Sequence, residues 1–139
     1  MNALIDTNVA LDILLRRKDY ASAMGVLGFA EKDIITGYIS ASAITDIFYI
    51  AKSKLGKNAT KEALKKLLQV FRPATVTDSH IYQALDLDWD DFEDSVQFIV
   101  SESFSADYII TRNTQDYTSS SIPAVTPEQF VSLIADIEK

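Results

Sequence analysis

Short apolar runs alternate with longer amphipathic segments along the whole chain. The apolar runs, bounded by polar or turn-forming residues, predict strands at residues 4–5, 34–39, 74–76, 107–110 and 124–125. The amphipathic segments predict helices at residues 7–17, 20–31, 42–55, 61–71, 78–87 and 91–104, and a last one from residue 127 onward. Because strands alternate with helices, we expect a parallel sheet covered by helices on both faces.

Capping signals predict where several of these helices begin and end. Ser42 and Thr60 are expected to cap the amino ends of the third and fourth helices, and Gly56 to end the third. The segment Thr126-Pro127-Glu128-Gln129 predicts a capping box with proline at the first helical position. Arg72-Pro73 ends the fourth helix, because proline disfavours helical geometry in the residue before it. These predicted helix boundaries indicate which polar residues follow each strand.

The composition limits the chemistry that the chain can carry. It has 139 residues, 47% of them hydrophobic, and no proline- or glycine-rich linker divides it, so we expect one domain over residues 1–139. The absence of cysteine excludes disulfides, thiolate zinc sites and cysteine nucleophiles. No secretory signal or membrane-spanning stretch is visible, so the expected location is the cytoplasm, with no membrane partner.

The charge is distributed unevenly along the chain, although its net value is −7. Residues 1–72 hold 11 Lys/Arg against 7 Asp/Glu, whereas residues 73–139 hold 2 against 13. The basic clusters are either solvated helix faces or a phosphate-contacting surface beside an acidic, cation-binding half. In the second interpretation, the residues that contact nucleic acid are Arg16, Arg17, Lys52, Lys61, Lys65 and Arg112.

Carboxylates, hydroxyls and side-chain amides follow the predicted strands directly. In an open parallel sheet, ligands bind outside the carboxyl ends of the strands. The residues expected at this edge are Asp6, Thr7 and Asn8 after the first strand, Asp46 after the second, Asp91, Glu93 and Asp94 before the fourth, and Thr111, Asn113 and Asp116 after the fourth. Asp107 precedes the fourth strand, so it is expected at the opposite edge.

Each carboxylate has an ordinary structural explanation on its own. Asp6 and Asp91 could each cap a helix. Asp46 could interact with a helix dipole, and Asp116 could order a turn. Together, however, several carboxylates at one edge would repel strongly in a low dielectric unless a hard cation neutralised them, and all-oxygen ligation points to Mg²⁺ or Mn²⁺. The lone His80 supports no competing catalytic set.

Three segments together resemble the PIN-domain family, and the resemblance spans nearly the whole chain. Residues 4–9 (LIDTNV) look like the opening strand and first acidic residue of that family. Residues 91–95 (DFEDS) look like its third acidic motif, and residues 106–113 (ADYIITRN) followed by Asp116-Tyr117 look like its fourth. The resemblance implies a three-layer α/β/α sandwich with a central parallel sheet of four or five short strands. It also implies metal-dependent endonucleolytic hydrolysis, with RNA as the substrate.

The resemblance assigns roles to individual residues as well. Asp6, Asp46, Asp94 and Asp116 would be the acidic quartet that binds the metal and carries catalysis. The supporting residues would be Thr7, Asn8, Asp91, Thr111 and Asn113. Two positions depart from many relatives, in which the second acid is Glu rather than Asp46 and the fourth follows the Thr-Arg pair directly. The fourth ligand is therefore either Asp116 or Asn113.

The predicted function is a Mg²⁺- or Mn²⁺-dependent endoribonuclease in which a metal-activated water hydrolyses the phosphodiester bond. Many small relatives are toxins, so the candidate partners are RNA, a small antitoxin protein and a second copy of the chain. The alternative is a PIN-like nucleic-acid-binding module with weak or no activity. A receiver-like signalling domain is disfavoured, because Asp6 has no adjacent acid and no lysine follows Val125.

Overall fold

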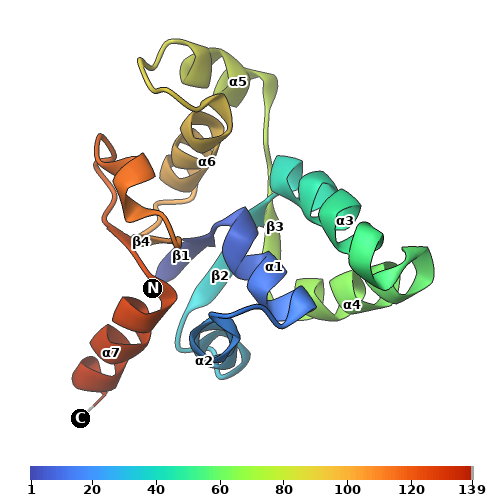
Figure 1. Ribbon diagram of the computed structural model, residues 1–139. Helices are drawn as coiled ribbons and strands as arrows, with labels where there is room; N and C mark the ends of the chain where they lie inside the picture. The colour runs from blue at the N-terminus through green and yellow to red at the C-terminus, as the bar shows by residue number, and fades with distance from the viewer. Residues whose placement is uncertain (139) are drawn as a thin grey trace.

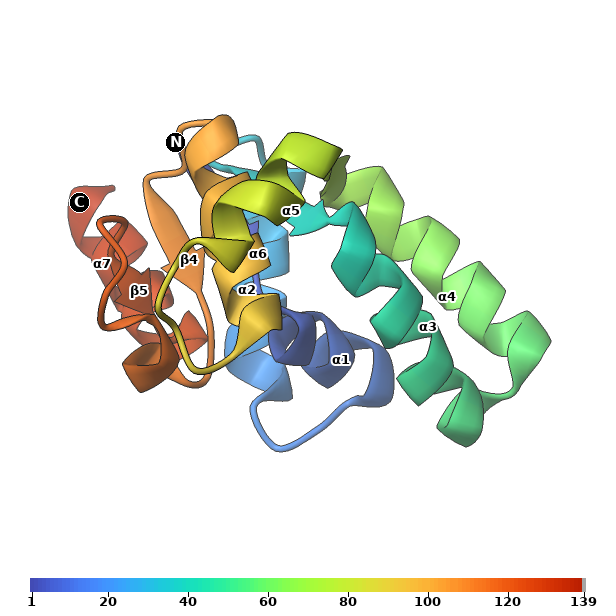
Figure 2. The ribbon, with the colours of Figure 1, turned by 90° about the horizontal axis from the view of Figure 1, so that it is seen from above.

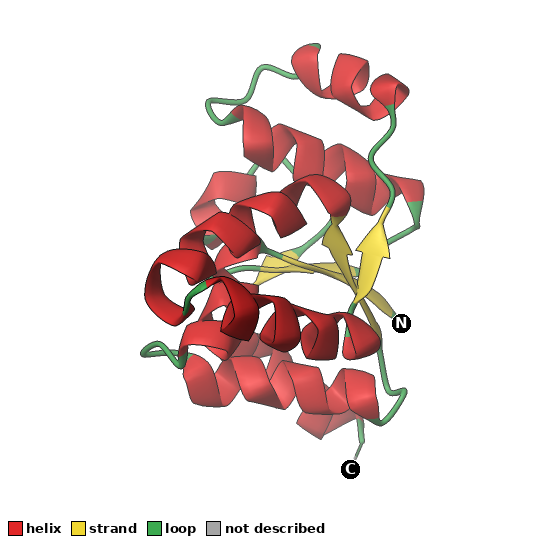
Figure 3. Cartoon of the chain, turned by 90° about the vertical axis from the view of Figure 1, so that its right-hand side faces the viewer, coloured by secondary structure: helices red, strands yellow, loops and turns green. Residues whose placement is uncertain are grey.

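The computed structural model describes residues 1–138, and these contain a five-stranded parallel sheet. The strands are β1 (Asn2–Ile5), β2 (Thr36–Ser40), β3 (Arg72–Ala74), β4 (Tyr108–Ile110) and β5 (Ala124–Val125). Their order in the sheet is β3-β2-β1-β4-β5, and each neighbouring pair is parallel. Helices lie above and below these strands in Figure 3, so the fold is the expected three-layer α/β/α sandwich.

The helices follow the strands in the alternation that the sequence predicts. They are α1 (Thr7–Leu15), α2 (Tyr20–Glu31), α3 (Ala41–Leu55), α4 (Lys57–Val70), α5 (Asp78–Leu85), α6 (Phe92–Ser103) and α7 (Pro127–Ile137), with a short 3₁₀ helix η1 (Thr114–Tyr117). Figure 1 shows α5 and α6 on one side of the sheet and α2, α4 and α7 on the other. Within residues 1–138, no helix combines the length and the apolar character needed to cross a membrane.

Each face of the sheet has its own hydrophobic core, because side chains alternate between the faces along a strand. Ile5 and Ile110 point into a core formed with α1, α2, α3, α4 and α7. Leu4 and Ile109 point into a second core formed with α5 and α6. These four side chains are fully buried. Burial on both faces explains why β1 and β4 contain continuous apolar runs rather than alternating ones.

Helices α3 and α4 lie side by side and project from the body of the molecule (Figure 2). We call residues 41–70 the α3–α4 arm. Gly56 joins the two helices with a φ of 81°, a conformation that glycine adopts without steric cost. The arm carries Asp46 on its α3 half and exposed lysines on both helices.

The predicted amino-terminal caps of α3 and α4 are wrong. Helix α3 is capped by Ser40, whose hydroxyl accepts a backbone N–H of the first turn, so Ser42 lies inside the helix. Helix α4 begins directly after Gly56, which places Thr60 within the helix, fully buried. Gly56 alone therefore separates the two helices. The turn at Gly56 and the packing of the arm determine where α4 begins.

The edge strand β3 lies two residues earlier than the sequence predicts. Arg72–Ala74 pairs with Tyr38–Ser40 of β2. Pro73 lacks an N–H group, and the edge position tolerates it because one side of the strand needs no partner. Phe71, fully buried, packs so closely on Gly37 that a Cβ there would lie 2.6 Å from its ring. This close approach fixes the start of the strand.

The carboxyl ends of β1 and β4 form the switch point of the sheet. From β1 the chain adds β2 and β3 on one side, and later adds β4 and β5 on the other. Open α/β sheets bind ligands in the crevice at such a point. Asp6 directly follows β1 and Thr111 directly follows β4, so the sheet brings together residues that are 105 positions apart.

Candidate active site

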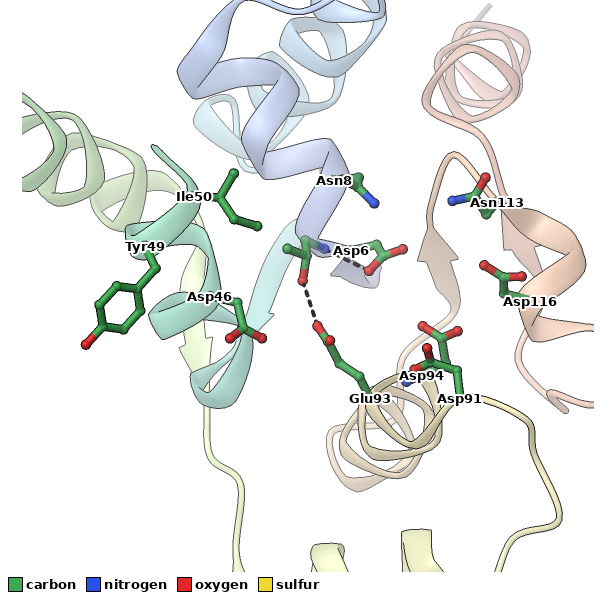
Figure 4. A pocket seen from close by; sticks show the side chains of 11 residues that line it. Asp6, Asn8, Asp46, Tyr49, Ile50, Asp91, Glu93, Asp94, Asn113 and Asp116 are labelled. Atoms are coloured by element: carbon green, nitrogen blue, oxygen red, sulfur yellow. Dashed lines mark hydrogen bonds between the residues drawn. The ribbon is translucent and has the colours of Figure 1, made fainter. Parts of the chain in front are cut away.

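A cavity of about 450 Å³ opens at the switch point (Figure 4). It is lined by Asp6, Thr7, Asn8, Asp46, Tyr49, Ile50, Asp91, Glu93, Asp94, Asn113 and Asp116. The structure thus brings the predicted quartet together with all the predicted supporting residues except Thr111, which is buried beside Asp6. Among residues 1–138, no lysine or arginine belongs to this lining.

Asp6 is held by hydrogen-bond donors from three parts of the fold. Its Oδ1 accepts the backbone N–H of Thr7 at 2.8 Å and the side-chain amide of Gln97 at 2.5 Å. Its Oδ2 accepts the hydroxyl of Thr111 at 2.7 Å. Asp6 also caps α1, and only 7% of it is exposed. The capping role and the proposed ligand role therefore coincide in one side chain.

The amino end of α6 delivers a group of carboxylates to the same cavity. Asp91 caps the helix, and its Oδ1 accepts the backbone N–H of Asp94 at 3.0 Å, as the sequence predicts. The positive end of the helix dipole stabilises anions in this first turn. Capping by Asp91 thus determines where Asp94 enters the cavity.

Asp94 lies among other carboxylates in a cavity whose lining, within residues 1–138, includes no lysine or arginine. Burial raises its pKa, the carboxylates of Asp91, Asp6 and Asp116 raise it further, and the hydroxyl of Tyr117 opposes the change, so that the pKa moves from 3.8 to about 7. Such a displacement means that the ionised form is disfavoured in this cavity. A bound cation would remove this penalty.

Glu93 also lines the cavity, at the edge where the sequence placed it, although it was given no role in the predicted site. Its Oε1 accepts the hydroxyl of Thr7 at 3.5 Å, so its side chain reaches toward the end of β1 (Figure 4). Burial raises its pKa, and the carboxylates of Asp46, Asp91 and Asp6 raise it further. The signal in the sequence for such a role was its position next to Asp94 in the first turn of α6.

The remaining predicted residues lie on the walls of the cavity. Asp46 comes from α3 on one wall, and Asn113 and Asp116 come from the segment after β4 on the opposite wall (Figure 4). The backbone N–H of Asn113 donates to the Thr111 hydroxyl at 3.1 Å, which links Asn113 through Thr111 to Asp6. Both Asn113 and Asp116 reach the cavity, and only Asp116 adds a charge.

Gln97 and Tyr117 lie behind the lining and were not predicted. Gln97 donates to Asp6, and the Tyr117 hydroxyl donates to Asp94 at 3.3 Å. One signal was present in the sequence, because Gln97 interrupts the apolar run at residues 96–100, three positions after Asp94. Tyr117 stands next to Asp116 in the segment that resembles the fourth acidic motif, but nothing in the sequence gave it a role of its own.

The residues predicted to contact nucleic acid lie outside the acidic cavity. Lys52, Lys61 and Lys65 are exposed on the α3–α4 arm, which also carries Asp46. Arg16 is exposed after α1, and its guanidinium lies 5.9 Å from the centre of the Tyr20 ring. Arg17 is half-buried and donates to Asn8 at 3.5 Å. The lysines are therefore exposed on the arm that supplies one wall of the cavity, with Lys65 lying 3.7 Å from the carboxylate of Glu62, while these two arginines contact the fold.

Arg112 is paired with carboxylates of the neighbouring helices. Its Nη1 lies 3.4 Å from Asp12 and 3.8 Å from Asp19. Burial raises the pKa of Asp12, and the guanidinium of Arg112 opposes this. Because Arg112 stands between Thr111 and Asn113, the ion pair ties the loop after β4 to α1. A phosphate contact by Arg112 stays a prediction.

Charge reversal at both Lys61 and Lys65 should weaken RNA binding and flatten its dependence on salt. For single-stranded nucleic acid, each lost phosphate contact lowers the slope of log K against log salt concentration by about 0.7, so the double variant should lose about 1.4. The measurement is fluorescence anisotropy with labelled RNA over a salt series. Lys32→Glu is the control, because Lys32 is exposed at the opposite edge of the sheet. An unchanged slope would mean that the lysines only solvate the arm.

The oxygen ligands of the cavity fit a divalent cation. In residues 1–138, no group of three or more acidic or histidine side chains is arranged to hold a metal ion as the side chains stand. The carboxylates of the lining nevertheless come from separate elements around one cavity and raise the pKa of one another. Carboxylate oxygens are the ligands that Mg²⁺ and Mn²⁺ prefer, so the chemistry of this lining suits such an ion.

The fold and the cavity define a class of α/β proteins that present carboxylates at the switch point of a parallel sheet. A family model described as PIN domain matches residues 2–115. The chain therefore belongs to the PIN-domain family, which confirms the resemblance seen in the sequence. A comparison with curated protein sequences gives no match.

Solved structures with a similar fold include proteins of toxin–antitoxin systems. VapBC2 of Rickettsia felis, bound to a DNA fragment from its promoter, gives a TM-score of 0.70 at 12% identity and covers 91% of this chain and 98% of that one. A toxin–antitoxin complex from Klebsiella pneumoniae gives 0.66 at 23% identity, with 90% and 97% covered. VapC20 of Mycobacterium tuberculosis, a toxin that cleaves the sarcin-ricin loop, gives 0.61 at 16% identity, with 77% and 86% covered. At these identities the likeness shows the fold alone.

Proposed function

We propose that this protein is a metal-dependent endoribonuclease. The observation that carries the proposal is the cavity at the switch point, where neighbouring carboxylates and burial raise the pKa of Asp94 to about 7. Crowded carboxylates destabilise a fold by mutual repulsion, and a bound divalent cation would relieve this repulsion. Membership of the PIN-domain family supports hydrolysis of phosphodiester bonds as the reaction.

The proposed ligands of one or two Mg²⁺ or Mn²⁺ ions are Asp6, Asp46, Asp94 and Asp116. When bound, such an ion supplies an activated water and stabilises charge on the phosphate oxygens. Thr7 and Thr111 orient Asp6 by donating to its two oxygens. Asp91 holds the backbone of Asp94 in the first turn of α6.

The amides of Asn8 and Asn113 line the same cavity and are placed to hydrogen-bond a phosphate oxygen or a water. Asn113 could also take the fourth ligand position through its carbonyl oxygen. The absence of lysine and arginine from the lining, within residues 1–138, leaves neutralisation of the phosphate to the cation. Contacts to the rest of the RNA strand fall to the exposed lysines of the α3–α4 arm.

RNA as the substrate and a role as the toxin of a toxin–antitoxin pair are supported by similarity of fold. VapC20 is a sarcin-ricin loop cleaving toxin, and the R. felis and K. pneumoniae structures are toxin–antitoxin proteins. We therefore propose a small antitoxin protein as a partner, with a second copy of the chain as a further candidate.

A second candidate function is a nucleic-acid-binding module without activity. Two features favour it: Asp46 is exposed and one methylene shorter than glutamate, and Asn113 occupies the position directly after the Thr-Arg pair. Metal binding separates the two functions, because a binding module needs no ion in this cavity.

Millimolar Mn²⁺ should raise the melting temperature of the protein, because an ion that binds only the folded state stabilises it by mass action. At about 100 times its Kd, the gain is about 3 kcal/mol, or about 8 °C for a chain of this length. Asp6→Asn should reduce the gain, whereas Asp107→Asn should keep it, since Asp107 lies at the other end of β4 and accepts the backbone N–H of Asn2. Calorimetry and a melting curve without response to Mn²⁺ would sink the metal hypothesis.

Cleavage itself is tested with a mixed pool of RNA and a matched pool of single-stranded DNA. Fragments of RNA are expected in Mg²⁺ or Mn²⁺, and none in excess chelator. Binding of RNA without cleavage in either metal would favour the binding module. Cleavage of DNA at the same rate as RNA would support a nuclease but contradict RNA as its specific substrate.

A further inference from the structure

A chain of neutral hydrogen-bonding groups connects Asp6 with Asp94 behind the cavity. The amide of Gln97 donates to Asp6 Oδ1 at 2.5 Å and lies 3.3 Å from the Tyr117 hydroxyl. That hydroxyl in turn donates to Asp94 Oδ1 at 3.3 Å. Two proposed ligands that are 88 positions apart in sequence are thus linked through two side chains.

The direction of these bonds follows from the groups themselves. An ionised carboxylate only accepts, so the NH₂ group of Gln97 must face Asp6. The Tyr117 hydroxyl can accept from this NH₂ group and donate its single proton to Asp94. In residues 1–138, the Oε1 atom of Gln97 has no hydrogen-bond partner, although it is buried. Burying the Gln97 amide with an unpaired oxygen therefore costs free energy of solvation. An apolar side chain at this position would fill the core without that cost.

Aromatic packing holds the second member of the chain rigidly. Tyr117 is 3% exposed, and its ring stands edge-on to Trp89 at a centroid distance of 6.0 Å. Trp89 in turn stacks on Phe98 of α6 at 5.0 Å. Gln97, 1% exposed, is equally enclosed. Neither side chain can leave without breaking this packing, so the separation of Asp6 and Asp94 is constrained.

The same bonds decide which oxygen of Asp6 remains free to bind a ligand. A carboxylate oxygen accepts about two hydrogen bonds. Oδ1 already accepts two, from Thr7 and Gln97, whereas Oδ2 accepts one, from Thr111. Oδ2 is therefore the oxygen with a lone pair left for a cation.

We propose that Gln97 and Tyr117 are positioning residues that form a neutral brace between Asp6 and Asp94. The brace holds the two carboxylates at a set separation and directs Asp6 Oδ2 toward the divalent cation. Because the donors are uncharged, they orient the carboxylates without competing as a lysine or arginine would for their charge. The proposal rests on the proposed function, since it concerns the metal site of the nuclease.

The test is the affinity for Mn²⁺, measured by isothermal titration calorimetry on the full chain. Tyr117→Phe removes the hydroxyl and keeps the ring that packs on Trp89, and Gln97→Leu removes the amide at similar volume. Loss of a group that orients a metal ligand typically weakens metal binding by about 10-fold to 100-fold, and we expect this for both variants. The matched control is Tyr108→Phe, whose ring packs on Phe130 on the other face of the sheet, and its Kd should equal that of the wild type.

The outcomes separate the brace from the proposed function. Weaker Mn²⁺ binding by Tyr117→Phe, with a melting temperature in chelator equal to that of the wild type, supports the brace, because a merely structural hydroxyl would change stability and not affinity. Wild-type affinity in Tyr117→Phe overturns the brace and leaves the nuclease standing, even where Gln97→Leu fails to fold. A wild-type protein that binds no Mn²⁺ overturns both.

Discussion

Replacing Asp6 or Asp94 by asparagine should slow RNA cleavage by about a thousandfold, because a bound cation contributes several kcal/mol to the transition state at about 1.4 kcal/mol per tenfold in rate. Asparagine keeps the size of the side chain and one oxygen ligand but removes the charge that neutralises the cation. The measurement is the single-turnover rate on a mixed RNA pool in Mg²⁺ and in Mn²⁺. Circular dichroism checks that each variant remains folded.

Two further variants make this result specific. Asp107→Asn is the control and should cleave at the wild-type rate, because the structure places this carboxylate at the opposite edge of the sheet. If Asp116 is the fourth ligand, Asp116→Asn should lower the rate much more than Asn113→Ala, and the reverse order would assign the position to Asn113. Wild-type rates in both Asp6→Asn and Asp94→Asn would place the activity elsewhere.

The metal-free protein should be less stable at pH 8 than at pH 5. The folded state raises the pKa of Asp94 from 3.8 to about 7, mainly by burial and then by the carboxylates of Asp91, Asp6 and Asp116. Between these values the folded chain holds a proton that the unfolded chain has released, so stability falls as the pH rises through this window. The part of this displacement that lies between pH 5 and pH 7 corresponds to about 3 kcal/mol, and we expect about 2 kcal/mol because the side chain is partly exposed to screening solvent.

Thermal denaturation in chelator between pH 5 and pH 8 measures this effect, which should amount to about 6 °C for a chain of this length. Asp94→Asn should flatten the profile, leaving the smaller contributions of Glu93 and Asp12, whose pKa values burial also raises. Saturating Mn²⁺ should restore stability at pH 8, because the ion replaces the proton as the neutralising charge. A metal-free protein that is equally stable across this range would show that solvent already screens the carboxylates of the cavity.

The affinity of the cavity for a metal ion should depend on pH, because the metal-free cavity favours protonated carboxylates. Binding of the cation must displace the proton that Asp94 holds near neutral pH, so the apparent affinity should rise with pH. The brace of Gln97 and Tyr117 acts on the same pair of carboxylates through orientation and not through charge.

Local signals in the sequence were sufficient for most of the secondary structure and for the polar residues at the strand ends. The capping box at Thr126 and Gln129 and the cap at Asp91 are confirmed, because each depends on residues within one turn of the helix. Asp6, Asp46, Asp94 and Asp116 do line one cavity, because the carboxyl ends of parallel strands share one edge. The caps at Ser42 and Thr60 failed where the packing of the arm overrode a local preference.

Only the tertiary structure decided which distant groups meet at that edge. The bond from Gln97 to Asp6 spans 91 positions and the one from Thr7 to Glu93 spans 86, so no local pattern could indicate them. The pairing of Arg112 with the buried Asp12 depends in the same way on how α1 packs beside the loop after β4. Periodicity and capping are set by neighbours along the chain, whereas the order of strands in the sheet and the faces that helices bury are set by the packing of the whole core. The packing of the core therefore determines the contacts of Gln97 and Tyr117, the position of Glu93 in the cavity and the separation of the carboxylates.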